Sequence, residues 1–209
     1  MNIKSIKVLA LSVGAALALT SGVSMAESQY GYNSAGTGTV TATAKVNLSV
    51  TVPKLILLKV GSSDSTGGVA VIDTLSWTAT ASIPNVPTIP TTGNNTGVVW
   101  DGTAPTIGAG TQPGSIAASA WTNATSATIS CAVSAWSVTG GPANTDFAVT
   151  ATGTLPHPGA TLGACGPTTA ITSNSLLSST WAFVLSGTSA ASWKAGAYTS
   201  TVTYTVSGI

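Results

Sequence analysis

Apolar and polar residues alternate along much of this chain, which is the pattern of β-strands. The longest such run covers Thr39–Val52 and is followed by Pro53. Its odd-numbered positions are mainly Thr, and its even-numbered positions are Val, Ala or Leu. A period of two over this length predicts a strand of roughly 45 Å. Pro53 ends the run because proline has no N–H for a sheet ladder.

Shorter segments repeat the same alternation after Pro53, and clusters of Gly, Pro and Asn separate them. No segment after the first 26 residues shows the spacing of an amphipathic helix. This organisation predicts an all-β protein with an Ig-like antiparallel β-sandwich, formed by residues 39–209 as one domain. The predicted strand segments are Leu55–Val60, Val69–Ile83, Thr128–Val138, Phe147–Thr152, Trp181–Leu185 and Tyr198–Val206.

Two stretches interrupt this picture. Residues 27–38 hold Tyr30 and Tyr32 and are expected to form a flexible N-terminal arm. Pro84–Gly114 is rich in Pro and Gly, and Val98–Trp100 is its only apolar cluster. Unstructured loops of this length are uncommon, so this region is predicted to be either functional or a decoration at one end of the sandwich.

The first 26 residues have the three parts of a secretory signal peptide. Lys4 and Lys7 precede the apolar stretch Val8–Leu19, and Ser24–Ala26 supplies small residues around a cleavage point. The apolar stretch is short for a membrane span, and no stop-transfer charges follow it. The sequence therefore predicts export through cleavage after Ala26, with no membrane span afterwards.

Charge is scarce. Charged residues make up 5% of the chain and the formal net charge is +1, with no Arg at all. Binding nucleic acid requires many Lys and Arg side chains, so this class of partner is excluded. Acid–base and metal chemistry need clustered titratable groups, yet the single histidine, His157, lies in a Leu-Pro-His-Pro-Gly turn with no carboxylate nearby in sequence. We expect no enzymatic activity, cofactor or metal site.

Export makes the two cysteines interpretable. Cys131 and Cys165 are the only pair, and they lack the spacing of a redox or zinc motif. In an oxidising compartment they are expected to form one disulfide bond.

The six tryptophans divide into two groups. Trp77, Trp136 and Trp181 occur in strand-like segments and are predicted to lie in the core. Trp100, Trp121 and Trp193 occur near predicted loops. An exposed Trp beside polar side chains can stack on a sugar ring. Trp100 with Asp101, and Trp121 with Asn123, are therefore candidates for a ligand platform.

The chain closes on a further alternating segment in which Gly196, Tyr198 and Val202 have a recognisable spacing. With the opening run Val40–Val52, this resembles bacterial fimbrial subunits, particularly alpha-type and related chaperone–usher pilins. The resemblance implies a pilin-like fold at the cell surface and polymerisation by donor-strand exchange with copies of itself. It also implies a periplasmic chaperone and an outer-membrane usher as partners. The inserting residues would be Val40, Ala42, Ala44, Val46, Leu48 and Val50.

Two other interpretations fit the same residues. Thr39–Val52 could be the first strand of a sandwich that is complete by itself, because a donated and an internal strand have the same alternation. The protein could also be a secreted carbohydrate-binding or adhesive module that uses its loop tryptophans. Only the tertiary structure can separate these hypotheses.

Overall fold

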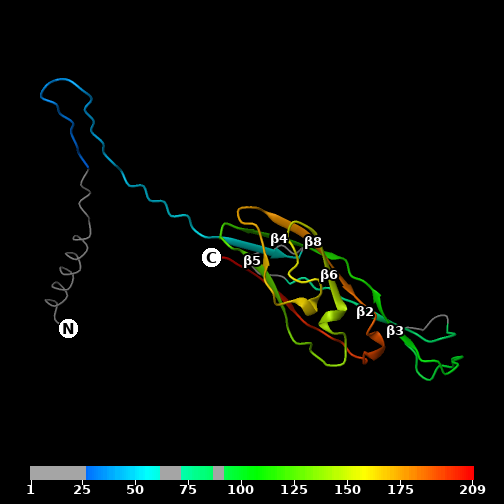
Figure 1. Ribbon diagram of the computed structural model, residues 1–209. Coiled ribbons are helices and arrows are strands. Elements are labelled where there is room, and N and C mark those ends of the chain that lie inside the picture. Colours follow the sequence, from blue (N-terminus) through cyan, green and yellow to red (C-terminus); the bar gives the residue numbers. More distant parts are fainter. Residues whose placement is uncertain (1–26, 62–71, 87–91) are drawn as a thin grey trace, which may run out of the picture. The chain divides into compact units, whose positions relative to one another are not determined.

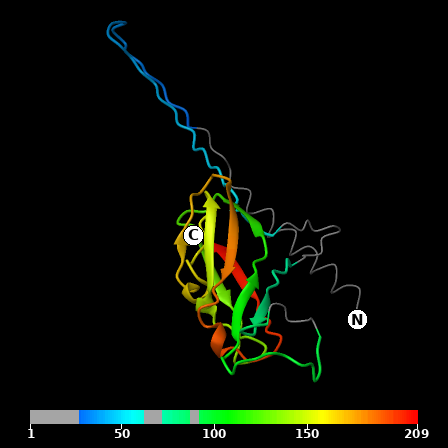
Figure 2. The same ribbon diagram turned by 90° about the vertical axis from the view of Figure 1, so that its right-hand side faces the viewer.

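A computed structural model of the chain describes residues 27–61, 72–86 and 92–209 (Figures 1 and 2). The predicted signal peptide, Met1–Ala26, lies outside the described residues. The chain divides into a unit that ends at Val52 and a unit that starts at Pro53. The larger unit therefore begins at Pro53 rather than at Thr39.

The unit from Pro53 is built from β-strands and short 3-10 turns, with no α-helix among the described residues. Its 3-10 turns are η2 (Asn144–Asp146), η3 (Leu162–Ala164) and η4 (Ala190–Ser192). The prediction of an all-β, antiparallel protein is confirmed. The strands are β1 (Ile56–Val60), β2 (Thr78–Ser82), β3 (Thr106–Thr111), β4 (Ser115–Thr122), β5 (Thr128–Val133), β6 (Phe147–Gly153), β7 (Thr169–Ala170), β8 (Leu177–Leu185) and β9 (Val202–Ser207).

The strands form three antiparallel sheets. The largest has the order β1-β4-β8-β6, the second has the order β7-β5-β9, and β2 pairs with β3. Figure 1 shows β4, β8 and β6 running side by side. The β2–β3 pair contains a register shift next to Gly110, which has a φ of 69°. Glycine is needed there because a Cβ would collide with the Thr78 carbonyl.

A single apolar cluster joins the two larger sheets. Buried positions alternate along β8, where Trp181 is fully buried and Phe183 and Leu185 are nearly so. Ile129 of β5 contributes from the other sheet and is also fully buried. Each of the two sheets contributes apolar side chains to this cluster. Removing these side chains from water stabilises the folded state.

The three tryptophans predicted for the core all pack in or against it. Trp181 is buried inside, whereas Trp77 and Trp136 are half-buried. Both of the latter contact Phe147, with ring centroids 5.2 Å and 5.5 Å away.

The Pro/Gly-rich region contains more structure than its composition indicates. β3 lies inside the predicted loop Pro84–Gly114, and β4 follows directly after it. The loop interpretation was wrong for β3, and β4 was missed. The inward positions of β4 are Ile116, Ala118 and Ala120, and the two alanines are almost fully buried. Small side chains give a weak strand signal, although they allow neighbouring layers to approach closely.

The run Thr39–Val52 forms no strand in the described structure. Its alternation is real, but a strand also needs a neighbour that satisfies its backbone N–H and C=O groups. Val46, Leu48, Val50 and Val52 are instead between 73% and 87% exposed. The first of the two alternatives, an internal first strand, is therefore not what the structure contains.

Residues 27–38 were expected to be a flexible arm, and the structure shows them folded back on the following segment. The chain turns at Asn33, whose carbonyl accepts a hydrogen bond from the Gly36 N–H at 3.2 Å. After the turn, the Lys45 N–H donates to Glu27 Oε2 at 2.8 Å. Figures 1 and 2 show this doubling back in the blue part of the chain.

The predicted disulfide is present. Cys131 of β5 and Cys165, just after η3, are 34 residues apart and their Cα atoms are 5.0 Å from each other. In the part of the chain that the structure describes, no helix has the length and apolar character needed to cross a membrane.

Candidate functional site

A groove of about 430 Å³ lies in the unit from Pro53, between the edge strands β1 and β9. Leu58 and Val60 line it from β1, and Val202 and Tyr204 line it from β9. These side chains occupy the half-buried positions of strands whose alternate residues are exposed. The alternation in both strands therefore directs their apolar side chains into the groove.

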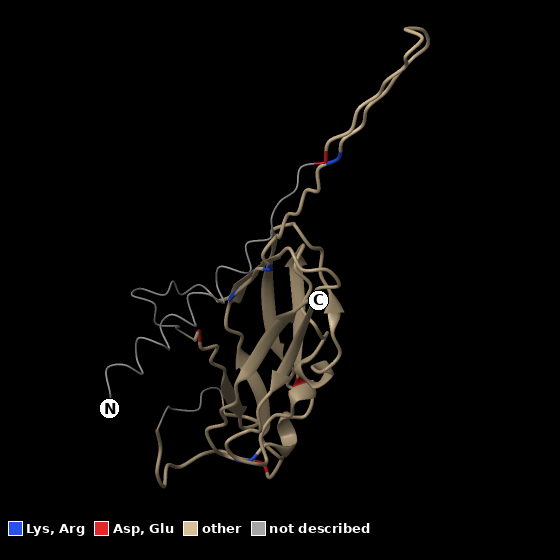
Figure 3. Ribbon diagram, turned by 90° about the vertical axis from the view of Figure 1, so that its left-hand side faces the viewer, with Lys and Arg blue, Asp and Glu red and all other residues tan. Residues whose placement is uncertain are grey.

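The groove opens onto the hydrophobic core. Its floor includes Phe147, Leu162 and Phe183, all of which belong to the main apolar cluster. Ile116 and Val133 extend this apolar surface from β4 and β5. Charged residues are sparse along both sheets (Figure 3), and among the described residues Asp73 is the one charged residue that lines the groove. A segment that fitted this groove would need to present apolar side chains on one face.

A segment that precedes β2 bounds the rest of the groove. Ile72, Leu75 and Trp77 line it, and Leu75 and Trp77 also pack against the core. The Trp77 Nε1 donates to Gln112 Oε1 at 2.9 Å, which fixes the indole beside the β3–β4 connection. This wall is therefore held by both packing and hydrogen bonding.

The end strands of the sheets differ in how their outer edges are used. At the end of the largest sheet away from β1, the edge of β6 is covered because the Val149 N–H donates to the Ala160 carbonyl at 2.9 Å. Ala148 also forms a β-bridge with Thr161. Within the described residues, the sheet orders give β1 and β9 one neighbouring strand each. The groove is thus bordered by two strand edges, which are templates for a further strand.

The predicted inserting residues all lie in the unit that ends at Val52. Val40 is 50% exposed, and Val46, Leu48 and Val50 are 80%, 87% and 85% exposed. Ala42 and Ala44 are also exposed. Exposed apolar side chains at every second position are unusual on a soluble protein and indicate a surface that becomes covered.

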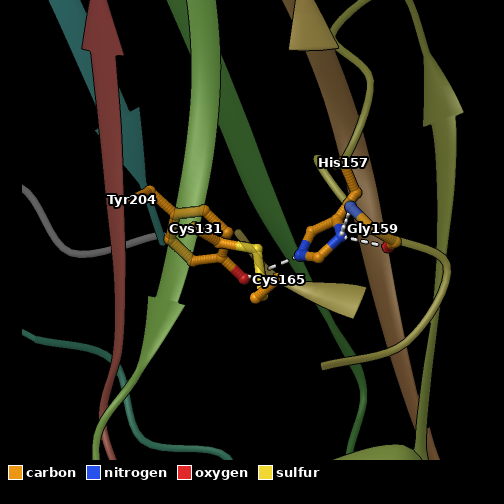
Figure 4. The surroundings of a disulfide bond; sticks show 5 residues. All are labelled: Cys131, His157, Gly159, Cys165 and Tyr204. Carbon is orange, nitrogen blue, oxygen red and sulfur yellow. Dashed lines mark hydrogen bonds between the residues drawn. A yellow bond between two sulfur atoms is a disulfide. The ribbon is translucent and has the colours of Figure 1, made fainter. Parts of the chain in front are cut away.

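His157 lies beside the groove wall rather than in a simple turn. Its Nε2 is 2.9 Å from the Tyr204 hydroxyl, and its Nδ1 is 2.5 Å from the Gly159 carbonyl (Figure 4). The Gly159 N–H also lies 3.2 Å from Nδ1. One tautomer donates from Nδ1 to the Gly159 carbonyl and accepts from Tyr204 at Nε2, and the other accepts at Nδ1 and donates from Nε2. His157 therefore makes a local contact within the predicted turn segment and a second contact to β9. Its ring also stands edge-on to Trp181, with centroids 5.0 Å apart.

Burial sets the protonation of this pair. It lowers the pKa of the His157 imidazole below its ordinary value of 6.5, while the Gly159 carbonyl acts in the opposite direction. Burial also raises the pKa of the Tyr204 hydroxyl. Cys131 faces Tyr204 in the β5–β9 register, so the disulfide and this pair share one face of the sheet (Figure 4). The arrangement holds β9 at the groove, and both side chains are neutral at pH 7.

The two candidate ligand platforms are on different elements. Trp100 lies in the connection before β3 and is 54% exposed, and its Nε1 donates to the Thr103 carbonyl at 2.6 Å. Asp101 accepts hydrogen bonds from the Thr103 N–H at 2.9 Å and from Asn85 Nδ2 at 2.7 Å. The Thr103 N–H is the main cause that lowers the Asp101 pKa. This loop therefore holds an indole that is about half exposed and is fixed by a hydrogen bond.

Trp121 does not lie in a loop, contrary to expectation. It is half-buried on β4 and faces Leu57 of β1. Its neighbour Asn123 binds the start of β1, where Oδ1 accepts from the Leu55 N–H and Nδ2 donates to the Pro53 carbonyl, both at 2.7 Å. Asn123 therefore fastens the entry to β1 rather than completing a sugar-binding surface with Trp121.

The sequence signalled the exposed alternating segment but not the groove. Most groove residues sit in segments that were recognised as strands, such as Val202 and Phe183. These residues come together in one groove because of the order of the strands in the sheets. The local alternation of apolar and polar residues does not determine that order. Comparisons with protein-family models, curated proteins and solved structures found no match for this chain.

Proposed function

We propose that this protein is an exported, non-enzymatic structural subunit that assembles with copies of itself. In this proposal the two larger sheets form an incomplete β-sandwich. The N-terminal alternating segment of one copy completes the sandwich of the next by filling the groove between β1 and β9. The observation that carries the proposal is the presence, in one chain, of an apolar groove bordered by two end strands and an exposed segment with alternating apolar side chains.

The energetics support such an exchange. Burying a Val or Leu side chain contributes about 1.5–3 kcal/mol, so Val46, Leu48 and Val50 together supply a substantial driving force. Main-chain hydrogen bonds to the strand edges would add affinity with little dependence on sequence. The contact is head-to-tail, because the segment and the groove are different surfaces, and such contacts extend into filaments when they do not close into rings.

The resemblance to fimbrial subunits adds an expectation about export. An apolar groove open to water, together with an exposed apolar segment on each copy, would favour association between copies before export is complete. A periplasmic chaperone that covers the groove and an outer-membrane usher that orders assembly are the partners the proposal implies, with the fimbrium at the cell surface as the destination.

Deleting Glu27–Val52 tests the proposal directly. We expect the shortened protein to be folded and monomeric, and to bind a synthetic Thr39–Val52 peptide. Size-exclusion chromatography with light scattering would report the mass, and peptide fluorescence anisotropy the binding. If the full and shortened chains had the same mass distribution and the peptide did not bind, the proposal would be rejected.

A pair of variants on one strand separates the groove from general surface effects. Val60→Asp places a carboxylate in the groove, whereas Leu57→Asp places one on the opposite face of β1, where Leu57 is 55% exposed. We expect Val60→Asp to weaken peptide binding at least tenfold and Leu57→Asp to leave it within twofold. Circular dichroism would establish that both variants are folded.

A second candidate function is binding of carbohydrate at Trp100, favoured by the fixed and exposed indole. Trp100→Ala should then abolish retention on a polysaccharide column without changing the melting temperature. Trp121→Ala is the comparison, because Trp121 packs beside β1 and its loss should lower the melting temperature instead. Unchanged retention of the Trp100 variant would remove this candidate.

A further inference from the structure

The alternating run Thr39–Val52 consists of two parts in different structural situations. Residues 39–45 lie alongside the residues that precede the turn at Asn33. A Cβ on Gly31 would lie only 2.8 Å from the Thr41 carbonyl oxygen, so the two backbones approach closely there. The Lys45 N–H is bound by Glu27 Oε2 at 2.8 Å. Residues 46–52 follow this contact.

Side-chain hydrogen bonds stabilise the turn that brings these residues together. Asn33 Oδ1 accepts a hydrogen bond from the Ala35 N–H at 2.9 Å, and Asn33 Nδ2 donates to the Thr37 carbonyl. Gly36 and Gly38 have φ values of 67° and 83°, which glycine adopts without strain. Residues 27–45 therefore form a folded-back segment, which we call the N-terminal hairpin.

The dimensions of the groove match only one part of the run. On the β9 side the groove is lined by residues between Ser200 and Tyr204, a span of roughly 17 Å in an extended chain. Val46–Val52 extends over roughly 23 Å, whereas Thr39–Val52 extends over roughly 45 Å. The shorter segment can lie along the groove with small overhangs, and the whole run is more than twice as long as this wall.

Side-chain size favours the same part. All the apolar side chains of Val46–Val52 are branched, and each is at least 73% exposed. In Thr39–Lys45 the apolar positions are Val40, Ala42 and Ala44, and two of these offer only a methyl group. A floor that contains Phe147, Leu162 and Phe183 is filled better by the larger set.

We infer that Val46–Val52 is the segment that enters the groove of a second copy of this chain, with Val46, Leu48, Val50 and Val52 directed to the floor. Val40, Ala42 and Ala44 stay outside the groove in the N-terminal hairpin. The assignment rests on the proposed function and narrows the expected set of inserting residues. In this assignment, the N-terminal hairpin of each subunit remains on the surface of the assembly.

Two peptides test this assignment on the protein that lacks Glu27–Val52. We expect the Val46–Val52 peptide to bind within about threefold of the Thr39–Val52 peptide, and the Thr39–Lys45 peptide to bind at least tenfold more weakly. Equal binding of the two short peptides, or binding that needs the whole run, would overturn the assignment while leaving the proposed function intact. If none of the three bound, the proposed function itself would fail.

Matched substitutions in the full chain supply the second test. Val50→Asn and Val40→Asn make the same change in the two parts of the run. We expect Val50→Asn to reduce the assembled fraction at least tenfold and Val40→Asn to leave it within twofold. Hydrogen exchange should show protection of the 46–52 amides on assembly and no added protection at 39–44. A larger loss for Val40→Asn, or new protection at 39–44, would contradict the assignment.

Discussion

His157 connects the chain after β6 to β9 through its two ring nitrogens. Its Nε2 lies 2.9 Å from the Tyr204 hydroxyl, and the ring lies against Trp181 and Phe183. Such an environment stabilises the neutral imidazole because a charge there loses hydration. The residue therefore links pH to the stability of the strand that lines the groove.

We expect the free energy of unfolding to fall as the pH drops below about 6.5. Burial lowers the His157 pKa in the folded state, so between the unfolded and folded values the unfolded chain binds more protons. The stabilisation is complete above the unfolded pKa and is lost as the pH falls through the folded pKa. Urea unfolding between about pH 5 and 8 measures this, a range in which most carboxylates stay ionised. His157→Gln should flatten the profile, and an unchanged slope would contradict the role given to His157.

Asn123 provides a second prediction at the scale of single residues. Its side chain binds the Leu55 N–H and the Pro53 carbonyl at the entry to β1. Asn123→Ala should lower the free energy of unfolding by about 1 kcal/mol, because both backbone groups lose a partner at a partly exposed site. Asn123→Asp keeps the acceptor for Leu55 but loses the donor, so it should cost less. Urea denaturation of both variants would show the order, and a neutral Asn123→Ala would contradict it.

At the scale of elements, β9 is held by several connections to other parts of the chain. It pairs with β5 over its whole length and contacts His157 through Tyr204. The disulfide of β5 at Cys131 ties this sheet to the segment after η3. An edge strand that accepts a new neighbouring strand needs such contacts, because it has backbone hydrogen bonds to a partner strand on only one side.

Removing the disulfide with Cys131→Ala and Cys165→Ala should destabilise the fold by roughly 3–4 kcal/mol. The crosslink closes a loop of 34 residues and restricts the unfolded chain. Differential scanning calorimetry should show a melting temperature about 10 °C lower, given the usual shift of about 2–4 °C per kcal/mol for this size. The oxidised and reduced wild-type proteins form the matched pair, and equal melting temperatures would contradict the prediction.

Considered as a whole, the molecule combines very low charge with an apolar groove and an exposed apolar segment. Charged residues make up 5% of the chain and the formal net charge is +1. Identical copies therefore repel one another weakly, which favours close packing in the proposed assembly. The association would be driven by burial of apolar surface and by backbone pairing.

It follows that the affinity of the Val46–Val52 peptide for the shortened protein should change less than twofold between about 50 mM and 500 mM NaCl, because screening acts on charges. Titration calorimetry at both salt concentrations would measure it, and a negative heat-capacity change is expected from apolar burial. Tenfold weakening at high salt would show that charged groups carry the contact instead.

The sequence by itself determined the strand-forming character of the chain and the pairing of its only two cysteines. Alternation of side chains is a local property, so the segments Phe147–Thr152 and Trp181–Leu185 were recognisable in advance, and they lie within β6 and β8. The alternation of Thr39–Val52 was equally clear, but alternation does not supply a partner strand. The sequence alone could not decide whether that run pairs within its own chain.

Only the tertiary structure decided which strands are neighbours and which strands border the groove. β4 was missed because its inward Ala118 and Ala120 are small, and they are nonetheless almost fully buried between larger side chains. Leu58 and Val202 are far apart in sequence, yet they line opposite walls of one groove. The same holds for His157 and Tyr204, whose contact depends on where the loop after β6 meets the sheet of β9. Burial and pKa depend on such long-range neighbours, which local sequence patterns do not specify.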